Sequence, residues 1–133
     1  MNFSHQGDIE NRKFLRIPKR YTLRHSRYVP LNADDEVFEN TTIDIGGGGL
    51  LFSSPVKYNM SELLRLEIDI PEWQKFLPEA SAEDKARPSG PFVTKAIVSR
   101  VDEVGPSNYA IGARFADLDR KEIWAIMFAI NKK

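Results

Sequence analysis

Two arginines near the start of the chain have the spacing and the chemistry of a binding pair. Arg12 and Arg16 lie four residues apart in the stretch NRKFLR. The planar guanidinium group of arginine donates two parallel hydrogen bonds, which match a carboxylate, a phosphate or the O6 and N7 atoms of guanine. The pair therefore indicates an anion or guanine site. A solvated basic segment that pairs loosely with Asp34, Asp35 or Glu36 is the alternative.

A carboxylate followed by a run of glycines comes about thirty residues later. Asp44 begins the stretch DIGGGG, which ends at Gly49. A hairpin needs one or two glycines, and each surplus glycine costs about 0.5–1 kcal/mol. Bare N–H groups can hold an anion, and missing β-carbons leave room for a planar group. The alternative is a glycine-rich hairpin in which Asp44 accepts bonds from its own turn.

The two motifs complement each other on one ligand. Asp44 can accept hydrogen bonds from N1–H and N2–H of guanine, which is the edge opposite to the one that arginine binds. Together with an anion-binding turn, arginine and aspartate fit a phosphorylated guanine. A Walker-type phosphate loop is excluded, because no Gly-Lys-Ser/Thr follows the glycines.

Short β-strands are expected to position these motifs. Alternation with a period of two predicts six strands, within residues 21–25, 37–45, 50–53, 64–70, 92–101 and 107–115. The second is expected to alternate without a break, which puts Thr42 and Asp44 on the same face. Short antiparallel strands in one small domain close most easily into a barrel. The predicted fold is therefore mainly β, a six-stranded antiparallel split barrel.

A C-terminal helix is predicted from about residue 120 to 130. Asp119 and Glu122 have the spacing of a capping box. The apolar residues of the helix form a stripe that could cap an open end of the barrel: Ile123, Ile126, Met127 and Ile130. Trp124 and Phe128 widen that stripe. They are either buried in a deep groove or in contact with another chain, such as a second copy in a homodimer.

The domain plan has one core and two irregular segments. At 133 residues and 41% hydrophobic, the chain suffices for one domain. Residues 1–11 are expected to be a flexible N-terminal arm, and residues 12–133 a single barrel domain. Residues 71–91 contain four prolines, which predicts a long loop with one helical turn around residues 73–77.

Charge and composition exclude several classes of protein. The 19 basic residues equal the 19 acidic ones, so the net charge predicts no attraction to nucleic acid or to anionic membranes. Residues 1–30 nevertheless carry seven Lys or Arg against two acids. There is no cysteine and therefore no disulfide or thiolate site. We expect a cytoplasmic protein, because neither a secretion signal nor a membrane span is recognisable.

The order of the motifs resembles the signature of the PilZ domain, a bacterial receptor module for cyclic di-GMP. That signature is R-x-x-x-R followed by D/N-x-S-x-x-G across a strand turn, and Arg12, Arg16, Asp44 and Gly49 match it. The stretch IGARF near the end of the chain is also similar to the family. The resemblance covers roughly residues 10–131 and extends to the six-stranded barrel with its C-terminal helix.

The resemblance implies roles for the matching residues. The two arginines would bind guanine Hoogsteen edges and phosphates, Asp44 would bind a guanine Watson–Crick edge, and the backbone of Gly46, Gly47 and Gly49 would close on the ligand. Gly46 stands where the family has serine, and the missing hydroxyl would cost about 0.5–1.5 kcal/mol.

Two residues of the last predicted strand are also candidates for the site. Gly112 and Arg114 share one parity, which is predicted to face outward. Gly112 could leave room for the ligand and Arg114 could flank it. An exposed strand charge beside a glycine is the alternative.

The expected function is a cyclic di-GMP signalling receptor. Ligand would fold the N-terminal arm onto the barrel and alter the binding of a protein partner. The alternative is a ligand-independent interaction module with a decayed nucleotide site. A barrel that binds single-stranded nucleic acid is disfavoured by the neutral charge. No metal site is expected, since His25 has no second ligand at useful spacing and His5 lies in the leader. No catalytic residues are expected either, since no combination of serine, histidine and acid and no carboxylate pair stands out.

Overall fold

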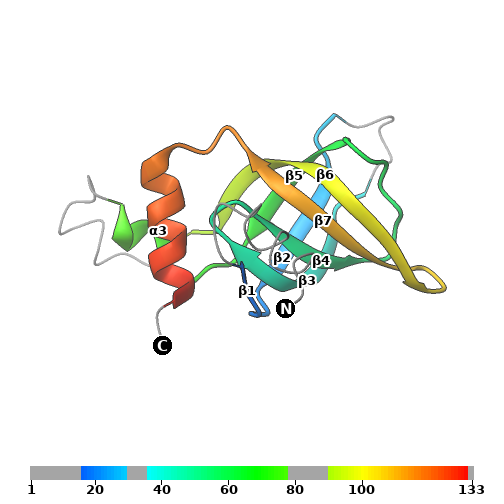
Figure 1. Ribbon diagram of the computed structural model, residues 1–133, viewed down its shortest axis with the longest axis horizontal. Helices are drawn as coiled ribbons and strands as arrows, with labels where there is room; N and C mark the ends of the chain where they lie inside the picture. The colour runs from blue at the N-terminus through cyan, green and yellow to red at the C-terminus, as the bar shows by residue number, and fades with distance from the viewer. Residues whose placement is uncertain (1–15, 30–35, 78–89, 132–133) are drawn as a thin grey trace, which may run out of the picture.

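A computed structural model describes residues 16–29, 36–77 and 90–131 of the chain (Figure 1). The predicted arm, Arg12 and most of the loop 71–91 lie outside these ranges. The elements are β1 (Arg16–Ile17), β2 (Thr22–Arg27), β3 (Phe38–Gly46), β4 (Gly49–Ser54), β5 (Leu63–Ile68), the 3-10 helix η1 (Trp73–Phe76), β6 (Phe92–Gly105), β7 (Asn108–Ala116) and α3 (Arg120–Asn131).

The strands form a closed antiparallel barrel with one strand outside it. The order is β1-β3-β2-β5-β6-β7-β4, and an additional pairing of β3 with β4 closes the ring. This confirms the predicted six-stranded barrel. The outer strand β1 was not expected. It joins the sheet through β3, where Arg16 pairs with Gly46 and Ile17 pairs with Ile45.

The barrel interior contains the inward-facing half of each strand. Leu64, Leu66 and Ile68 of β5 are fully buried, as the alternation predicts. Arg65 and Glu67 between them carry charges at the other face. The core also takes in Leu23, Ile45, Leu50, Phe52, Phe92, Ala96, Val98, Ile111 and Ala113.

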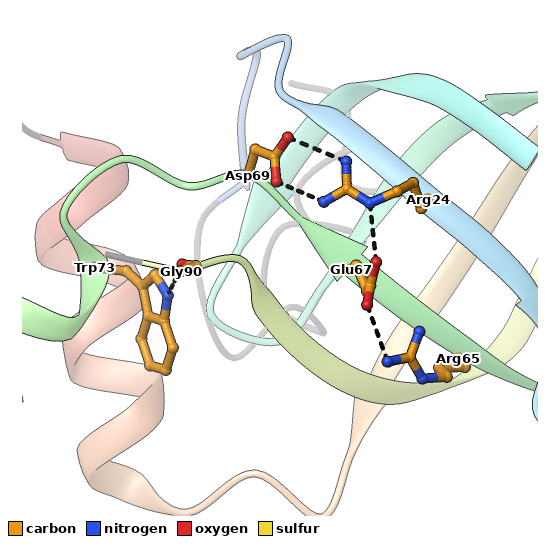
Figure 2. A network of polar contacts seen from close by, with 6 residues as sticks. All are labelled: Arg24, Arg65, Glu67, Asp69, Trp73 and Gly90. Atoms are coloured by element: carbon orange, nitrogen blue, oxygen red, sulfur yellow. Dashed lines mark hydrogen bonds and ion pairs between the residues drawn. The ribbon is translucent and has the colours of Figure 1, made fainter. Parts of the chain in front are cut away.

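A charged network joins β2 to β5 on the outside of the barrel. The register places Arg24 opposite Glu67, and its guanidinium donates to Glu67 at 2.9 Å and to both oxygens of Asp69 (Figure 2). Arg65 donates to the other oxygen of Glu67. The hydrogen bond from Arg24 has the largest effect on the pKa of Glu67 and lowers it, and the bond from Arg65 lowers it further. Partly exposed pairs of this kind contribute about 0.2–1 kcal/mol each.

Helix α3 covers one end of the barrel (Figure 1). Its start is the predicted capping box, in which the Glu122 N–H donates to Asp119 Oδ1 at 2.8 Å. The buried face consists of Ala125, Ile126, Ala129 and Ile130. Small alanines on this face allow the helix to pack closely on the barrel.

The two aromatic residues of α3 lie outside this contact. Trp124 is 54% exposed and Phe128 is 52% exposed, so the expectation of a deep groove for them is wrong. Their rings stack at 5.6 Å between centroids, and Phe128 also stacks on Phe76 of η1 at 6.1 Å. The pair therefore forms an exposed apolar patch on the outer side of the helix.

The 3-10 helix η1 confirms the predicted helical turn and fixes the described ends of the long loop. Trp73 Nε1 donates to the carbonyl of Gly90 at 3.0 Å (Figure 2). The Gly90 N–H donates to the side-chain oxygen of Gln74. Gly90 is thus held against η1, which contacts α3.

His25 is a buried polar residue with both ring nitrogens bonded. Nδ1 lies 2.7 Å from the Tyr58 hydroxyl, and Nε2 lies 2.8 Å from Asn40 Oδ1. Since the amide oxygen can only accept, the neutral ring carries its proton on Nε2 and accepts from Tyr58 at Nδ1. Burial lowers the pKa of His25, while the bond to Asn40 opposes that shift.

The stability of the fold should therefore depend on pH. As the pH falls below about 6.5, the unfolded chain protonates this histidine and the folded protein does not. The stabilisation is complete above about pH 6.5 and is lost progressively below it. Urea titrations from about pH 8 to about pH 5 should show a falling free energy of unfolding, and His25→Gln should flatten this part of the profile. A wild-type profile that is flat there would contradict the assignment.

Candidate functional site

A β-bulge in β3 determines where Asp44 points. The pairing of β3 with β4 is regular at Thr42–Phe52 and at Ile45–Leu50, but it shifts between Thr42 and Asp44. Thr42 is buried and Ile45 is fully buried, so one extra residue separates two inward positions. The prediction of an unbroken alternation is wrong here. Without the extra residue, Asp44 would share the inward face of Thr42.

The outer face of the barrel wall receives Asp44 instead. Its partner in β4 is Leu51, whose neighbours Leu50 and Phe52 are fully buried. Opposed residues share a face, so Asp44 lies with Leu51 on the outside of the wall. This position keeps the carboxylate out of the barrel core.

Strand β1 brings Arg16 to the same face. Arg16 lies opposite Gly46, which is two residues beyond Asp44 and therefore of the same parity. Arg16 Nη1 is 3.6 Å from Asp44 Oδ1, and the two side chains are 20% and 23% exposed. Gly46, which faces Arg16 in the ladder, adds no side chain. The arginine and the acid that the sequence singled out are thus neighbours.

One oxygen of Asp44 has no hydrogen bond. Oδ1 is buried and lacks a hydrogen-bond partner among the described residues. Arg16 is near enough to attract its charge, but at 3.6 Å it is too far for a hydrogen bond. Buried acceptors are nearly always bonded in native proteins. An incoming N–H donor would therefore satisfy this oxygen.

Thr42 fastens the segment between β1 and β2 to the barrel wall. Its hydroxyl donates to the Lys19 carbonyl at 2.6 Å and accepts from the Tyr21 N–H at 2.8 Å. These bonds help to hold the strand that carries Arg16. Sequence reasoning did not identify Thr42, although a polar residue on the inward parity of a strand is an available indication.

The glycine run has a packing role as well as an exposed part. β3 includes Gly46 and β4 starts at Gly49, so Gly47 and Gly48 form the turn. A Cβ on Gly49 would lie 2.3 Å from the Ala113 carbonyl oxygen, and one on Gly47 would lie 2.9 Å from Ile123 Cγ2. No glycine in the described ranges has a positive φ. Close approach of the chain's own elements therefore explains two of these four glycines, and Gly48 is the exposed one.

Strand β7 contributes Arg114 to the surroundings of the turn. Arg114 is exposed and lies opposite Gly49, on the outer face that also carries Asp44. Gly112 does not leave room for a ligand as expected, because a Cβ there would lie 3.0 Å from the Arg100 Cβ. The structure thus brings Arg114 to the site face and assigns Gly112 to packing.

A surface groove lies apart from this cluster. Its volume is about 370 Å³, and it is lined by residues of β5, β6, β7 and the start of α3 together with Tyr28. Both of its cationic residues are engaged, since Arg65 pairs with Glu67 and Lys95 lies 4.9 Å from the Tyr28 ring centroid.

Two further findings concern metals and membranes. Within residues 16–29, 36–77 and 90–131, no three His, Cys, Asp or Glu side chains come together as a set that could hold a metal ion. None of the helices in those ranges combines the length and the apolar character needed to cross a bilayer.

Solved structures with similar folds include those of three bacterial proteins. The Bacillus subtilis inhibitor of motility MotI/DgrA has a TM-score of 0.60 at 16% identity, and the match covers 90% of this chain and 49% of that chain. The PilZ domain of YcgR from Escherichia coli, solved with c-di-GMP, has a TM-score of 0.57 at 14% identity, with 89% of each chain covered. The K. pneumonia MrkH–c-di-GMP complex has a TM-score of 0.57 at 14% identity, with 90% and 50% covered.

These comparisons differ in what they establish. The chain spans about half the length of MotI/DgrA and of MrkH, and identities this low show the fold alone. No curated protein matches the sequence significantly. The model of the PilZ domain family matches residues 10–129, which is most of the chain and includes the arginine pair, Asp44 and the glycine turn. The chain therefore belongs to the PilZ domain family.

Proposed function

We propose that this protein is a receptor for cyclic di-GMP. The observation that carries the proposal is the position of Arg16 3.6 Å from Asp44, on the outer face of the barrel wall, with one buried carboxylate oxygen unbonded within the described residues. A guanidinium and a carboxylate side by side match the two edges of guanine.

Each edge of guanine has a group to bind it. The Arg16 guanidinium would donate to O6 and N7 of one base or to a phosphate. Asp44 would accept from N1–H and N2–H of a guanine, which satisfies Oδ1. Arg12, which lies outside the described residues, would supply the second fork. Arg114 would flank the ligand from β7.

The glycine turn would hold a phosphate through its backbone. Gly48 is exposed, and the N–H groups of Gly46, Gly47 and Gly49 adjoin it in the chain. Successive N–H groups in such a turn can bind an anion. The YcgR domain and MrkH, which share the fold, were solved with c-di-GMP, and this supports the choice of nucleotide.

We propose a receptor role without catalysis. His25, the histidine of the described part of the chain, is fully buried with both nitrogens bonded, so it is not available as a general base. Ligand binding would instead hold the segment that carries Arg12 against the barrel beside Arg16. Ordering each residue costs about 1–2 kcal/mol, which the charged contacts would have to supply. The new surface would then change the binding of a protein partner.

A second candidate function is supported by the patch on α3. A protein-interaction module that does not respond to nucleotide would explain why Trp124 and Phe128 are more than half exposed, and Gly46 in place of serine fits a weakened site. Calorimetric titration with cyclic di-GMP separates the two functions. Heat of saturable binding supports the receptor, and its absence supports the module.

Arg16→Ala should abolish or greatly weaken the binding of cyclic di-GMP. Each lost charge-assisted bond is worth about 1.5–3 kcal/mol, which is at least about tenfold in Kd. The melting temperature should change little, because the side chain makes a partly exposed ion pair. Arg65→Ala is the matched control, since Arg65 is also an ion-paired arginine on a strand and should leave binding intact. Normal binding by Arg16→Ala together with a large loss of stability would show that Arg16 is structural.

Gly46→Ser should tighten the binding of cyclic di-GMP by about threefold to tenfold, because one neutral hydrogen bond is worth about 0.5–1.5 kcal/mol. The new hydroxyl would stand opposite Arg16 in the ladder and two residues from Asp44. Gly105→Ser is the control, because that hairpin glycine has room for a Cβ and lies outside the site. Weaker binding by Gly46→Ser would show that the site requires glycine there.

The patch on α3 should also mediate self-association if a second copy is its partner. Sedimentation at increasing concentration should then show a dimer, and Phe128→Ser should shift the protein to monomer, since one of the two aromatic rings of the patch is lost. Val104→Ser, at a residue 61% exposed on β6, should leave the dimer unchanged. A monomer at all concentrations would exclude the homodimer.

A further inference from the structure

Helix α3 packs directly on the turn that the ligand would contact. A Cβ built on Gly47 would lie 2.9 Å from Ile123 Cγ2, 3.1 Å from Met127 Cγ and 3.2 Å from Met127 Sδ. Real Cβ atoms almost never approach others as closely as the first of these distances. The backbone of Gly47 is therefore in contact with two side chains of the helix.

These two side chains have a different environment from the core face of α3. Ile126 and Ile130 are buried in the barrel core, whereas Ile123 and Met127 are half-buried. Residues four apart lie one above the other on a helix, so Ile123 and Met127 form a short ridge. This ridge contacts the turn, and the neighbouring core face anchors the helix to the barrel.

The turn is held by β7 as well as by the ridge. On its β7 side, the Gly48 carbonyl accepts from the Phe115 N–H at 3.0 Å, and Gly49 abuts the backbone of Ala113. Glycines have more conformational freedom than any other residue, so a turn of this composition depends on its surroundings for a fixed shape. The ridge supplies that support at Gly47.

We infer that Ile123 and Met127 are positioning residues of the nucleotide site, which hold the Gly47 backbone in the shape that binds the ligand. The inference rests on the proposed function for the identity of the ligand, but the mechanical contact is independent of it. Neither side chain touches the ligand. Both act through the turn, so the C-terminal helix belongs to the binding site although the family motif contains none of its residues.

Linkage makes this coupling reciprocal. If the seating of α3 favours ligand binding, ligand binding favours the seating of α3 by the same free energy. The same helix carries Trp124 and Phe128 on its outer side, and Phe128 stacks on η1. A ligand held by the turn would thus stabilise the element that presents the exposed aromatic patch.

The experiment compares substitutions on two faces of one helix in the full chain. Met127→Ala and Ile123→Ala should each weaken the binding of cyclic di-GMP by about threefold to tenfold, the range for residues that act through a neighbour. Ile126→Val is the matched control, because it perturbs the core face and leaves the ridge intact. Its Kd should stay within about twofold of the wild-type value. Equal weakening by Ile126→Val, at matched melting temperatures, would overturn the inference.

A second measurement does not require the ligand. The {¹H}–¹⁵N heteronuclear NOE reports picosecond-to-nanosecond mobility of backbone amides. In the free protein, Met127→Ala should lower it at Gly47 and Gly48, and Ile126→Val should not. An unchanged value in Met127→Ala would overturn the inference even if the wild-type protein binds the nucleotide. If the wild-type protein gives no binding heat but the amide mobility changes as expected, the proposed ligand is wrong and the coupling stands.

Discussion

The bulge in β3 is the constraint on which the site depends. By inserting one residue between Thr42 and Ile45, it keeps both of these side chains inside the barrel and turns Asp44 to the outside. A regular strand with Thr42 inside would bury the carboxylate of Asp44 and turn Ile45 to the outside. Bulges cost ladder hydrogen bonds and are common next to functional sites. Here the bulge lets the barrel keep its core while the wall acquires an acid.

The same region shows how one glycine run can meet two demands. Glycine is needed at position 47 because α3 packs on the backbone there, and at position 49 because β7 does. A side chain at either position would force these elements apart. The turn is consequently bare on its other side as well. Packing and ligand access therefore favour the same residues, so the glycine count alone cannot separate a binding turn from a packed one.

Much of this architecture could be predicted from the sequence, because local backbone geometry leaves a pattern in the sequence. Features without a local pattern were missed. The alternation in residues 64–70 and the Asp119–Glu122 box report local backbone geometry, and both are confirmed. The bulge was missed because its residues remain compatible with either parity, and β1 was missed because two residues are too few to show a period. The contact between Met127 and Gly47 joins residues eighty apart and has no local signature.

Arg16 is already held in the sheet before any ligand binds, and this changes the energetics of the proposed receptor. If both arginines had to be ordered by the ligand, several residues at about 1–2 kcal/mol each would oppose binding. Strand β1 and the bonds of Thr42 already hold residues 16–21 against β3 without ligand. A group held in place before binding contributes more of its contact energy to affinity. Part of the proposed site is thus preorganised, and this would offset the hydroxyl that Gly46 lacks.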